Sequence, residues 1–256
     1  MLTLGVDFAA DPARTALCWI LWENGRAEVL PGASCGADDN ALLAAFAEAD
    51  KVGIDAPFGW PDAFVEAIVA HRDGRPWPRH DPKREALRFR RTDVAVHDRT
   101  HRWPLSVSSD RIGVTTMRLA GLLSRLEQGG ETIARDGSGK LVEVYPAAAL
   151  SVWAFDSQGY KRKENRDVRC RLLGAVRART QNWLTLPDAV CRTCQDSDDV
   201  LDAVIAALVA RAAATGRCEP IPDELRACAG REGWIAVPGA GSLDELAAAS
   251  ESPPTI

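Results

Sequence analysis

The sequence predicts an α/β protein in which helices flank a mixed β-sheet. At the N-terminus, three short strand-like segments follow one another closely, which indicates an antiparallel meander. Farther along the chain, helical and strand-like segments alternate, an order typical of strands joined by helical crossovers. A sheet built from both parts is mixed, and its first three strands are antiparallel.

The three N-terminal strands each have a recognisable boundary. Residues 3–6 form a short apolar run that ends at Asp7. Residues 15–22 are rich in β-branched and aromatic side chains, and the Asn-Gly dipeptide after them is typical of a two-residue hairpin turn. We therefore expect residues 26–30 to form the returning strand.

The first helix and the fourth strand follow directly. Either Asp38 or Asp39 is expected to cap a helix that runs to about residue 50 and carries an apolar face. Residues 52–55 then form a short buried strand.

The remaining elements are less regular. Between residues 72 and 110 the periodicity is lost, and because structureless loops of that length are uncommon, this stretch is expected to be a functional insertion or partly helical. Helices are expected at 62–71, 111–128, 163–180 and 197–214, and strands at 141–145 and 234–237. The Ser-Glu-Ser-Pro-Pro sequence near the C-terminus predicts a loose tail over residues 242–256.

The composition excludes several classes of protein. Of the 256 residues, 46% are hydrophobic, which supplies a core and excludes predominant disorder. No apolar run approaches the roughly 20 residues of a membrane span, and no basic segment of the signal-peptide kind opens the chain, so we expect a cytoplasmic protein that does not bind membranes. Seven cysteines, an odd number, indicate free thiols, and zinc at Cys191 and Cys194 is the weaker alternative.

Two acidic residues end predicted strands. Asp7 follows residues 3–6, and Asp55 ends residues 52–55. Ligands of open α/β sheets bind beyond the carboxyl ends of the strands, and an ionised carboxylate that leaves a buried strand needs a partner. Each residue alone could simply begin a turn, but two acids at equivalent positions favour a functional site.

Three further acids are candidates. Asp199 and Asp202 lie three residues apart at the start of the 197–214 helix and share a face. The helix dipole accounts for Asp199, but its effect fades after the first turn, so Asp202 favours a functional role. Glu143 lies among the apolar residues of the 141–145 strand and needs a partner, for which an arginine is the structural alternative.

Clustered carboxylates suit hard divalent ions such as Mg²⁺ or Mn²⁺. Two ions about 4 Å apart would hold a phosphodiester and activate the attacking water. We therefore expect a two-ion site whose metal ligands are Asp7, Asp55, Asp199 and Asp202. The expected catalytic residues are Asp7, Asp55, Glu143 and Asp202.

Several stretches between residues 5 and 238 match a known family. They include Gly-Val-Asp-Phe-Ala at 5–9, Ile-Asp-Ala-Pro-Phe-Gly-Trp-Pro at 54–61 and Asp-Val-Leu-Asp-Ala at 199–203. Shorter matches lie at 89–93, 142–146, 160–169 and 232–238. On these stretches the chain resembles the DUF429 family of predicted RNase H-like nucleases.

The resemblance implies a single RNase H-like domain over residues 5–238, with a five-stranded sheet whose first three strands are antiparallel. The irregular basic stretch would then be an insertion in this domain, at about 71–130. The resemblance also implies a metal-dependent nuclease that hydrolyses phosphodiester bonds. Two alternatives remain open: a non-catalytic regulatory or interaction protein that retains the fold, and an ATP-dependent phosphotransferase of the actin and sugar-kinase type. The second is disfavoured because Phe-Ala-Ala, rather than a glycine-rich phosphate loop, follows Asp7.

Positive charge is concentrated in two segments. The net charge is −5, yet residues 71–111 hold 11 Lys and Arg against 6 Asp and Glu, and residues 160–179 hold 8 against 2. We expect nucleic acid to bind along these segments, with Trp77 and Trp103 stacking on bases. A solvated helix surface is the alternative for part of the second segment.

Four basic residues lie in the stretches that match the family and are expected to bind substrate phosphates: Arg91, Lys161, Arg166 and Arg169. Asp93 could instead form a structural pair with a neighbouring arginine. His97 and His101 are four residues apart, which makes a histidine metal site a weaker alternative.

Overall fold

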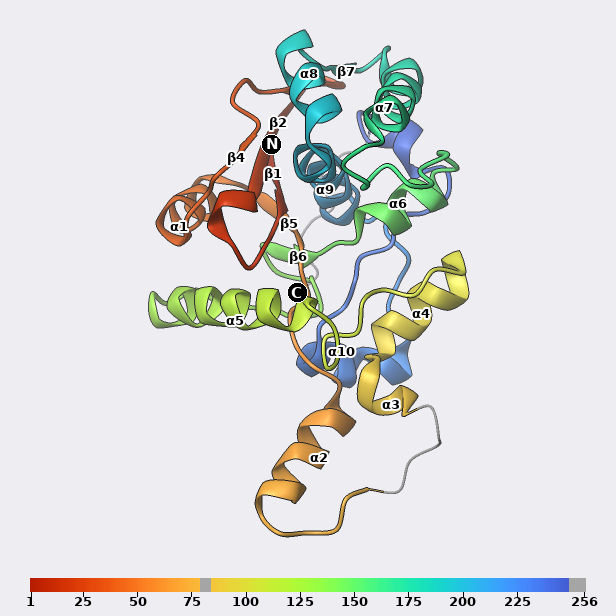
Figure 1. Ribbon diagram of the computed structural model, residues 1–256. Coiled ribbons are helices and arrows are strands. Elements are labelled where there is room, and N and C mark those ends of the chain that lie inside the picture. Colours follow the sequence, from red (N-terminus) through yellow and green to blue (C-terminus); the bar gives the residue numbers. More distant parts are fainter. Residues whose placement is uncertain (79–83, 249–256) are drawn as a thin grey trace.

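A seven-stranded mixed sheet forms the centre of the computed structural model, which describes residues 1–78 and 84–248 (Figure 1). The strand order is β6-β5-β1-β2-β3-β7, and β4 pairs with β2. The antiparallel meander comprises β1 (Leu2–Asp7), β2 (Ala16–Glu23) and β3 (Arg26–Val29). Strand β5 (Lys51–Asp55) pairs with β1 in parallel, and β6 (Leu141–Glu143) pairs with β5 in parallel. The predicted α/β class and mixed sheet are confirmed.

The expected number of five strands is wrong. The two additional strands are β4 (Ser34–Cys35) and β7 (Leu184–Thr185), which pairs with β3. Two-residue strands are too short to show any periodicity in the sequence. The strand expected at residues 234–237 is reduced to an isolated bridge between Ile235 and Glu143.

Helix α9 (Asp198–Ala214) lies directly against one face of the sheet. Gly5 and Gly53 are paired in the β1–β5 ladder, and both face this helix. A Cβ atom on Gly5 would lie 1.9 Å from the carbonyl oxygen of Ala203, and one on Gly53 would lie 2.4 Å from that of Ala206. The helix backbone can therefore approach the sheet only because these two strand residues have no side chain.

We expect Gly5→Ala to destabilise the protein by about 2–3 kcal/mol, because the added methyl group meets backbone atoms that cannot rotate away. Chemical denaturation measures the change. Gly121→Ala on the exposed side of α5 is the matched control, since an added Cβ there meets nothing within 4 Å. Equal unfolding midpoints for the two variants would contradict this close packing.

Helices α1 (Asp39–Glu48) and α5 (Ile112–Gln128) cover the opposite face of the sheet (Figure 1). The side chain of Asp38 accepts a hydrogen bond from the amide of Ala41, so the predicted cap is confirmed. The core on this face is formed by Leu4, Val6, Leu42, Phe46, Val52, Ile54, Leu119 and Leu122.

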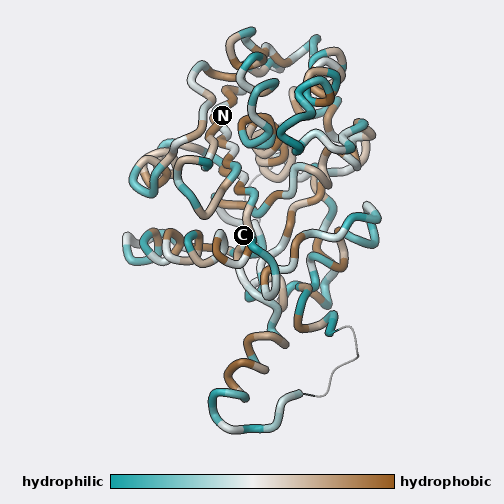
Figure 2. Tube along the Cα trace, in the orientation of Figure 1, coloured by the Kyte–Doolittle hydropathy of each residue, from teal (hydrophilic) through white to brown (hydrophobic). Residues whose placement is uncertain are grey.

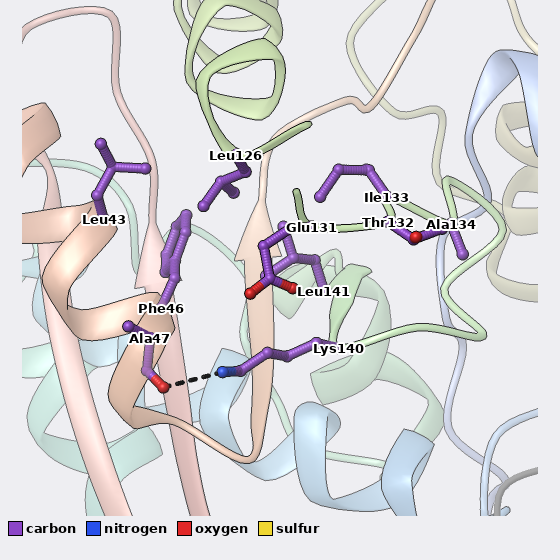
Figure 3. Close-up of a pocket in the computed structure, with 10 residues that line it drawn as sticks. All are labelled: Leu43, Phe46, Ala47, Leu126, Glu131, Thr132, Ile133, Ala134, Lys140 and Leu141. Carbon is purple, nitrogen blue, oxygen red and sulfur yellow. Dashed lines mark hydrogen bonds between the residues drawn. The ribbon is translucent and has the colours of Figure 1, made fainter. Parts of the chain in front are cut away.

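A small pocket of about 50 Å³ lies where α1 and α5 meet residues 131–134 (Figure 3). Leu43, Phe46, Leu126 and Leu141 line it, and Lys140 closes one side by donating a hydrogen bond to the carbonyl of Ala47. Leu141 begins β6, so the pocket lies at the amino ends of the parallel strands, away from the predicted site.

The stretch without periodicity is partly helical, as one of its two interpretations predicted. Helix α2 (Asp62–Arg72), which precedes this stretch and confirms the helix predicted at 62–71, extends away from the body of the molecule (Figure 1). Helices α3 (Glu85–Arg88) and α4 (Arg91–Thr100) follow. Part of the predicted basic insertion, residues 79–83, lies outside the described residues.

Helices α6 (Pro146–Val152) and α8 (Asp188–Asp196) pack against α9, and α7 (Arg166–Thr180) packs against α8. Helix α10 (Arg226–Glu232) lies apart from them, beside α4 and α2 (Figure 1). Figure 2 shows that apolar residues are concentrated in the interior of the molecule. Short 3₁₀ helices occur at Pro12–Arg14, Asp223–Leu225 and Ser242–Glu245. The seven cysteines are free, as predicted, and Cys191 and Cys194 are buried.

The prediction of a loose tail over residues 242–256 is wrong for the first residues of this range. Leu243 and Leu246 are fully buried in the core around α9, because both are apolar and the short helix turns them inward. The rest of the expected tail, residues 249–256, lies outside the described residues. Within residues 1–78 and 84–248, no helix combines the length and apolarity that crossing a membrane requires.

Candidate metal centre

Three carboxylates meet where β1 and β5 end. Asp7 and Asp55 are paired residues at the ends of these parallel strands, and Asp202 comes from the second turn of α9. One carboxylate oxygen from each residue lies within 4.8 Å of the other two. The structure thus brings together three of the acids that the sequence predicted, and we call them the acid cluster.

The packing of α9 explains how Asp202 reaches the strands. The side chain of Ser197 caps this helix by accepting a hydrogen bond from the amide of Val200. Asp202 precedes Ala203, whose backbone lies against Gly5, two residues before Asp7. The close helix–sheet contact therefore holds a helix carboxylate against two strand carboxylates.

Burial and mutual repulsion perturb the acid cluster. Burial is the largest cause that raises the pKa of Asp55, to about 7, and the charge of Asp202 adds to it while Lys161 opposes it. The pKa of Asp7 is raised well above its ordinary value, again by burial first and then by Asp202 and Asp55. Both carboxyl groups therefore favour the protonated form more than a free carboxyl group does, and a bound cation would relieve this.

We expect the stability of the protein in a chelator to fall as the pH rises from about 4 to about 7. Carboxylates of the unfolded chain titrate near pH 3.9, whereas Asp55 titrates near 7 when folded, so the folded state binds more protons across this window. Thermal melts at stepped pH test this, with Asp55→Asn expected to show the flatter profile. A wild-type melting temperature that climbs more than that of the variant would contradict the assignment.

The loop before α7 places two further side chains on Asp202. The hydroxyl of Tyr160 donates a 2.6 Å hydrogen bond to Oδ1, and Nζ of Lys161 lies 2.6 Å from Oδ2 and 3.9 Å from Oδ2 of Asp55. Lys161, predicted as a phosphate contact, therefore contacts carboxylates. Tyr160 was missed, and its only sequence signal is its place beside Lys161 in a matching stretch.

Asp199 lies beside the acid cluster but outside it. Its carboxylate pairs with Arg14 at 2.9 Å, and its side chain is only 16% exposed. The charge of Asp199 still contributes to the raised pKa of Asp7. Asp199, which was predicted as a metal ligand, therefore forms an ion pair with Arg14 and is not part of the acid cluster.

Glu143 points to the other side of the sheet. It is paired with Ile54, which faces α1 and α5, whereas the next residue, Asp55, faces α9. Arg90 binds both carboxylate oxygens of Glu143, at 2.6 and 2.8 Å, and the amide of Phe58 donates a third hydrogen bond. The structure does not bring this predicted catalytic acid into the cluster, and the arginine alternative is confirmed.

Arg90 also explains Asp93. Its guanidinium donates to both carboxylate oxygens of Asp93, at 2.9 and 3.2 Å, and all three side chains of this group are at most 2% exposed. The structural pair considered for Asp93 is confirmed, with Arg90 as the partner. Removing one of these three charged side chains is costly, because it leaves a buried charge without compensation.

The other predicted phosphate contacts lie away from the acid cluster. Arg169 is 3% exposed and donates to the backbone carbonyls of Gln195, Tyr160 and Arg162. Arg166 pairs with Asp196 at 2.7 Å. Arg91 is exposed, and its amide donates to Glu232. The hydrogen bonds of Arg169 hold the loop that carries Lys161, so its guanidinium is not free to bind a phosphate.

The predicted base-stacking residues are already in contact with other rings. Trp103 is stacked between Phe89 and His97, with ring centroids 4.2 and 4.0 Å away. Trp77 meets the ring of His71 edge-on. Because the ring of His97 is stacked on Trp103, the structure gives no support to a metal site at His97 and His101.

A cavity of about 170 Å³ opens beside the acid cluster. Asp7, Asp55 and Lys161 lie on one side of it, and Leu105 and Tyr145 are among its apolar and aromatic walls. A ligand in this cavity would contact the carboxylates and the ammonium group together.

A second group of potential ligands comprises Asp62, Cys228 and Glu232, which also approach within 4.8 Å of one another. Glu232 accepts hydrogen bonds from the amides of Asp62 and Arg91, at the starts of α2 and α4. Asp62 pairs with Arg231 at 2.7 Å. Helix capping thus explains this second group without an ion.

Comparison with known proteins identifies a family. The family model described as "Protein of unknown function (DUF429)" matches residues 5–227, a range that contains the whole acid cluster. No curated protein and no solved structure matches the chain. The description of the family assigns no activity.

Proposed function

The chain belongs to the DUF429 family, and we propose that it is a divalent-metal-dependent nuclease that hydrolyses phosphodiester bonds on an RNase H-like fold. The observation that carries the proposal is the acid cluster at the ends of β1 and β5. The sheet adds support, because an antiparallel meander followed by strands parallel to β1 matches what the resemblance implies.

The donor set fits Mg²⁺ or Mn²⁺. Three carboxylates within 4.8 Å offer only hard oxygen ligands, and the raised pKa values of Asp7 and Asp55 indicate a site whose charge a cation would relieve. Asp7 and Asp55 would hold the ion, and Asp202 would add its negative charge beside it. When bound, the ion would neutralise the phosphate charge and lower the pKa of the attacking water. The cavity beside them would admit the nucleotide, with Lys161 facing its phosphate.

The basic segments offer fewer free charges to nucleic acid than their counts suggest. Many of their arginines pair within the protein, including Arg72, Arg90, Arg99, Arg166, Arg177 and Arg179. Among the described residues of the two segments, seven basic side chains are exposed and make no ion pair: Arg84, Arg88, Arg91, Arg111, Arg162, Lys163 and Arg171. A nucleic acid that binds the cavity would draw on these remaining charges.

A cleavage assay tests the proposal. Single-stranded DNA, RNA, hybrids and branched junctions are incubated with Mg²⁺ or Mn²⁺, and we expect metal-dependent cleavage of at least one substrate. Asp55→Asn should lower the rate by about 100-fold or more, since it removes a ligand of the ion. Asp223→Asn, at a 91% exposed carboxylate, is the matched control.

One observation favours a non-catalytic protein instead. Lys161 already neutralises part of the acid cluster, as a purely structural network would require. Binding of Mn²⁺ at the cluster without cleavage of any substrate would support this second function over the nuclease.

A further inference from the structure

Lys161 contributes a positive charge inside the acid cluster. Its ammonium group lies 2.6 Å from Oδ2 of Asp202 and 3.9 Å from Oδ2 of Asp55. The other oxygen of Asp202 accepts the hydrogen bond from Tyr160. Both oxygens of Asp202 therefore have protein partners, while Asp7 and Asp55 have the open cavity beside them.

The loop around Lys161 is held in a defined conformation. The buried guanidinium of Arg169 donates to the carbonyls of Tyr160, at 3.0 Å, and of Arg162, at 2.9 Å, which are the residues on either side of Lys161. The side chain of Asn165 donates to the carbonyl of Gly159 at 2.9 Å. Lys161 is thus presented to the acid cluster by a supported backbone, although 45% of its side chain is exposed.

The charges of the acid cluster balance with one divalent ion. Three carboxylates are neutralised by one divalent ion together with one ammonium group, whereas a second divalent ion would leave an excess of two positive charges. The two acids that could have offset this excess have other partners, since Glu143 binds Arg90 and Asp199 binds Arg14. Buried charge without compensation is costly.

We propose that Lys161 is a tethered cation that takes the place of a second metal ion, so that the centre binds a single divalent ion on the side of Asp7 and Asp55. This inference rests on the proposed metal centre and replaces the two-ion site expected from the sequence. With substrate in the cavity, the ammonium group would contact the phosphodiester from the position that a second ion occupies in a two-ion centre.

Counting bound Mn²⁺ tests the inference without measuring activity. Titration calorimetry gives the number of ions per chain, and electron paramagnetic resonance separates a lone ion from a spin-coupled pair. We expect one uncoupled Mn²⁺ in the wild type, a second, coupled Mn²⁺ in Lys161→Gln, and one ion again in Lys161→Arg. Lys163→Gln, two residues away in the same loop and exposed, is the control and should bind one ion.

The outcomes separate this inference from the proposed function. A coupled pair of ions in the wild type, or a single ion in Lys161→Gln, overturns the role of Lys161 and leaves the metal-dependent nuclease intact. Failure of the wild type to bind any Mn²⁺ overturns both proposals. The wild-type count does not depend on whether the variants fold.

Discussion

Asp7→Asn is expected to raise the melting temperature of the protein in a chelator at about pH 8 and to abolish its stabilisation by Mg²⁺ or Mn²⁺. The pKa of Asp7 is raised well above its ordinary value, so the ionised carboxylate opposes folding at this pH. Removing that charge should therefore stabilise the protein at this pH. The wild type should recover about 2.7 kcal/mol when the ion is present at 100 times its dissociation constant.

Most substitutions lower the melting temperature of a protein, whereas Asp7→Asn is expected to raise it. Below about pH 4 both forms of residue 7 are neutral, so the difference between the two proteins should vanish there. Asp223→Asn should follow the wild type in every condition, because its carboxylate is exposed. An Asp7→Asn protein that melts below the wild type at about pH 8, or that still gains stability from Mg²⁺, would count against the acid cluster as a metal site.

Arg90→Met is expected to destabilise the protein by about 3–5 kcal/mol. The substitution leaves the buried carboxylates of Glu143 and Asp93 without the guanidinium that now binds both. Arg90 now lowers the pKa of Glu143, so this pKa would rise in the folded variant, and the stability of the variant should be greatest at acid pH and should fall as the pH rises. Urea unfolding at about pH 5 and pH 8 measures both effects.

Arg91→Met provides the matched control for this prediction. It replaces the next residue, whose side chain is exposed and makes no ion pair within the described residues, so a change within about 0.5 kcal/mol is expected. Comparable losses in the two variants would show that the buried network contributes little to stability.

The meeting of Asp7 and Asp55 could be predicted because it depends on strand direction alone. Both acids end strands that run parallel in the sheet, and parallel strands bring their carboxyl ends to one edge. Asp202 could be predicted from its place beyond the first turn of an otherwise apolar helix, where the helix dipole no longer explains an acid.

The position of Glu143 could not be predicted in the same way. Alternation along the strand groups it with Leu141, but which face of the sheet that group occupies depends on the pairing of Glu143 with Ile54. That pairing joins segments almost 90 residues apart, and no local pattern specifies it. The same limit applies to Lys161, whose loop conformation depends on Arg169 and not on regular structure.

Elements of the fold were missed for a related reason. The strands β4 and β7 have two residues each, and pairing with β2 and β3 rather than an intrinsic pattern makes them strands. The composition around Leu243 and Leu246 is typical of a flexible tail, yet both leucines are buried in the core around α9. In each case tertiary contacts decided what local sequence left open.

Anomalous scattering from a crystal soaked in Mn²⁺ shows whether the acid cluster binds a divalent ion. We expect a manganese peak bonded to the carboxylate oxygens of Asp7 and Asp55, beside the cavity that these residues line, and no such peak in crystals of Asp55→Asn. A wild-type crystal without a peak between Asp7 and Asp55, or with its peak at Asp62 and Glu232 instead, would contradict metal binding at the acid cluster.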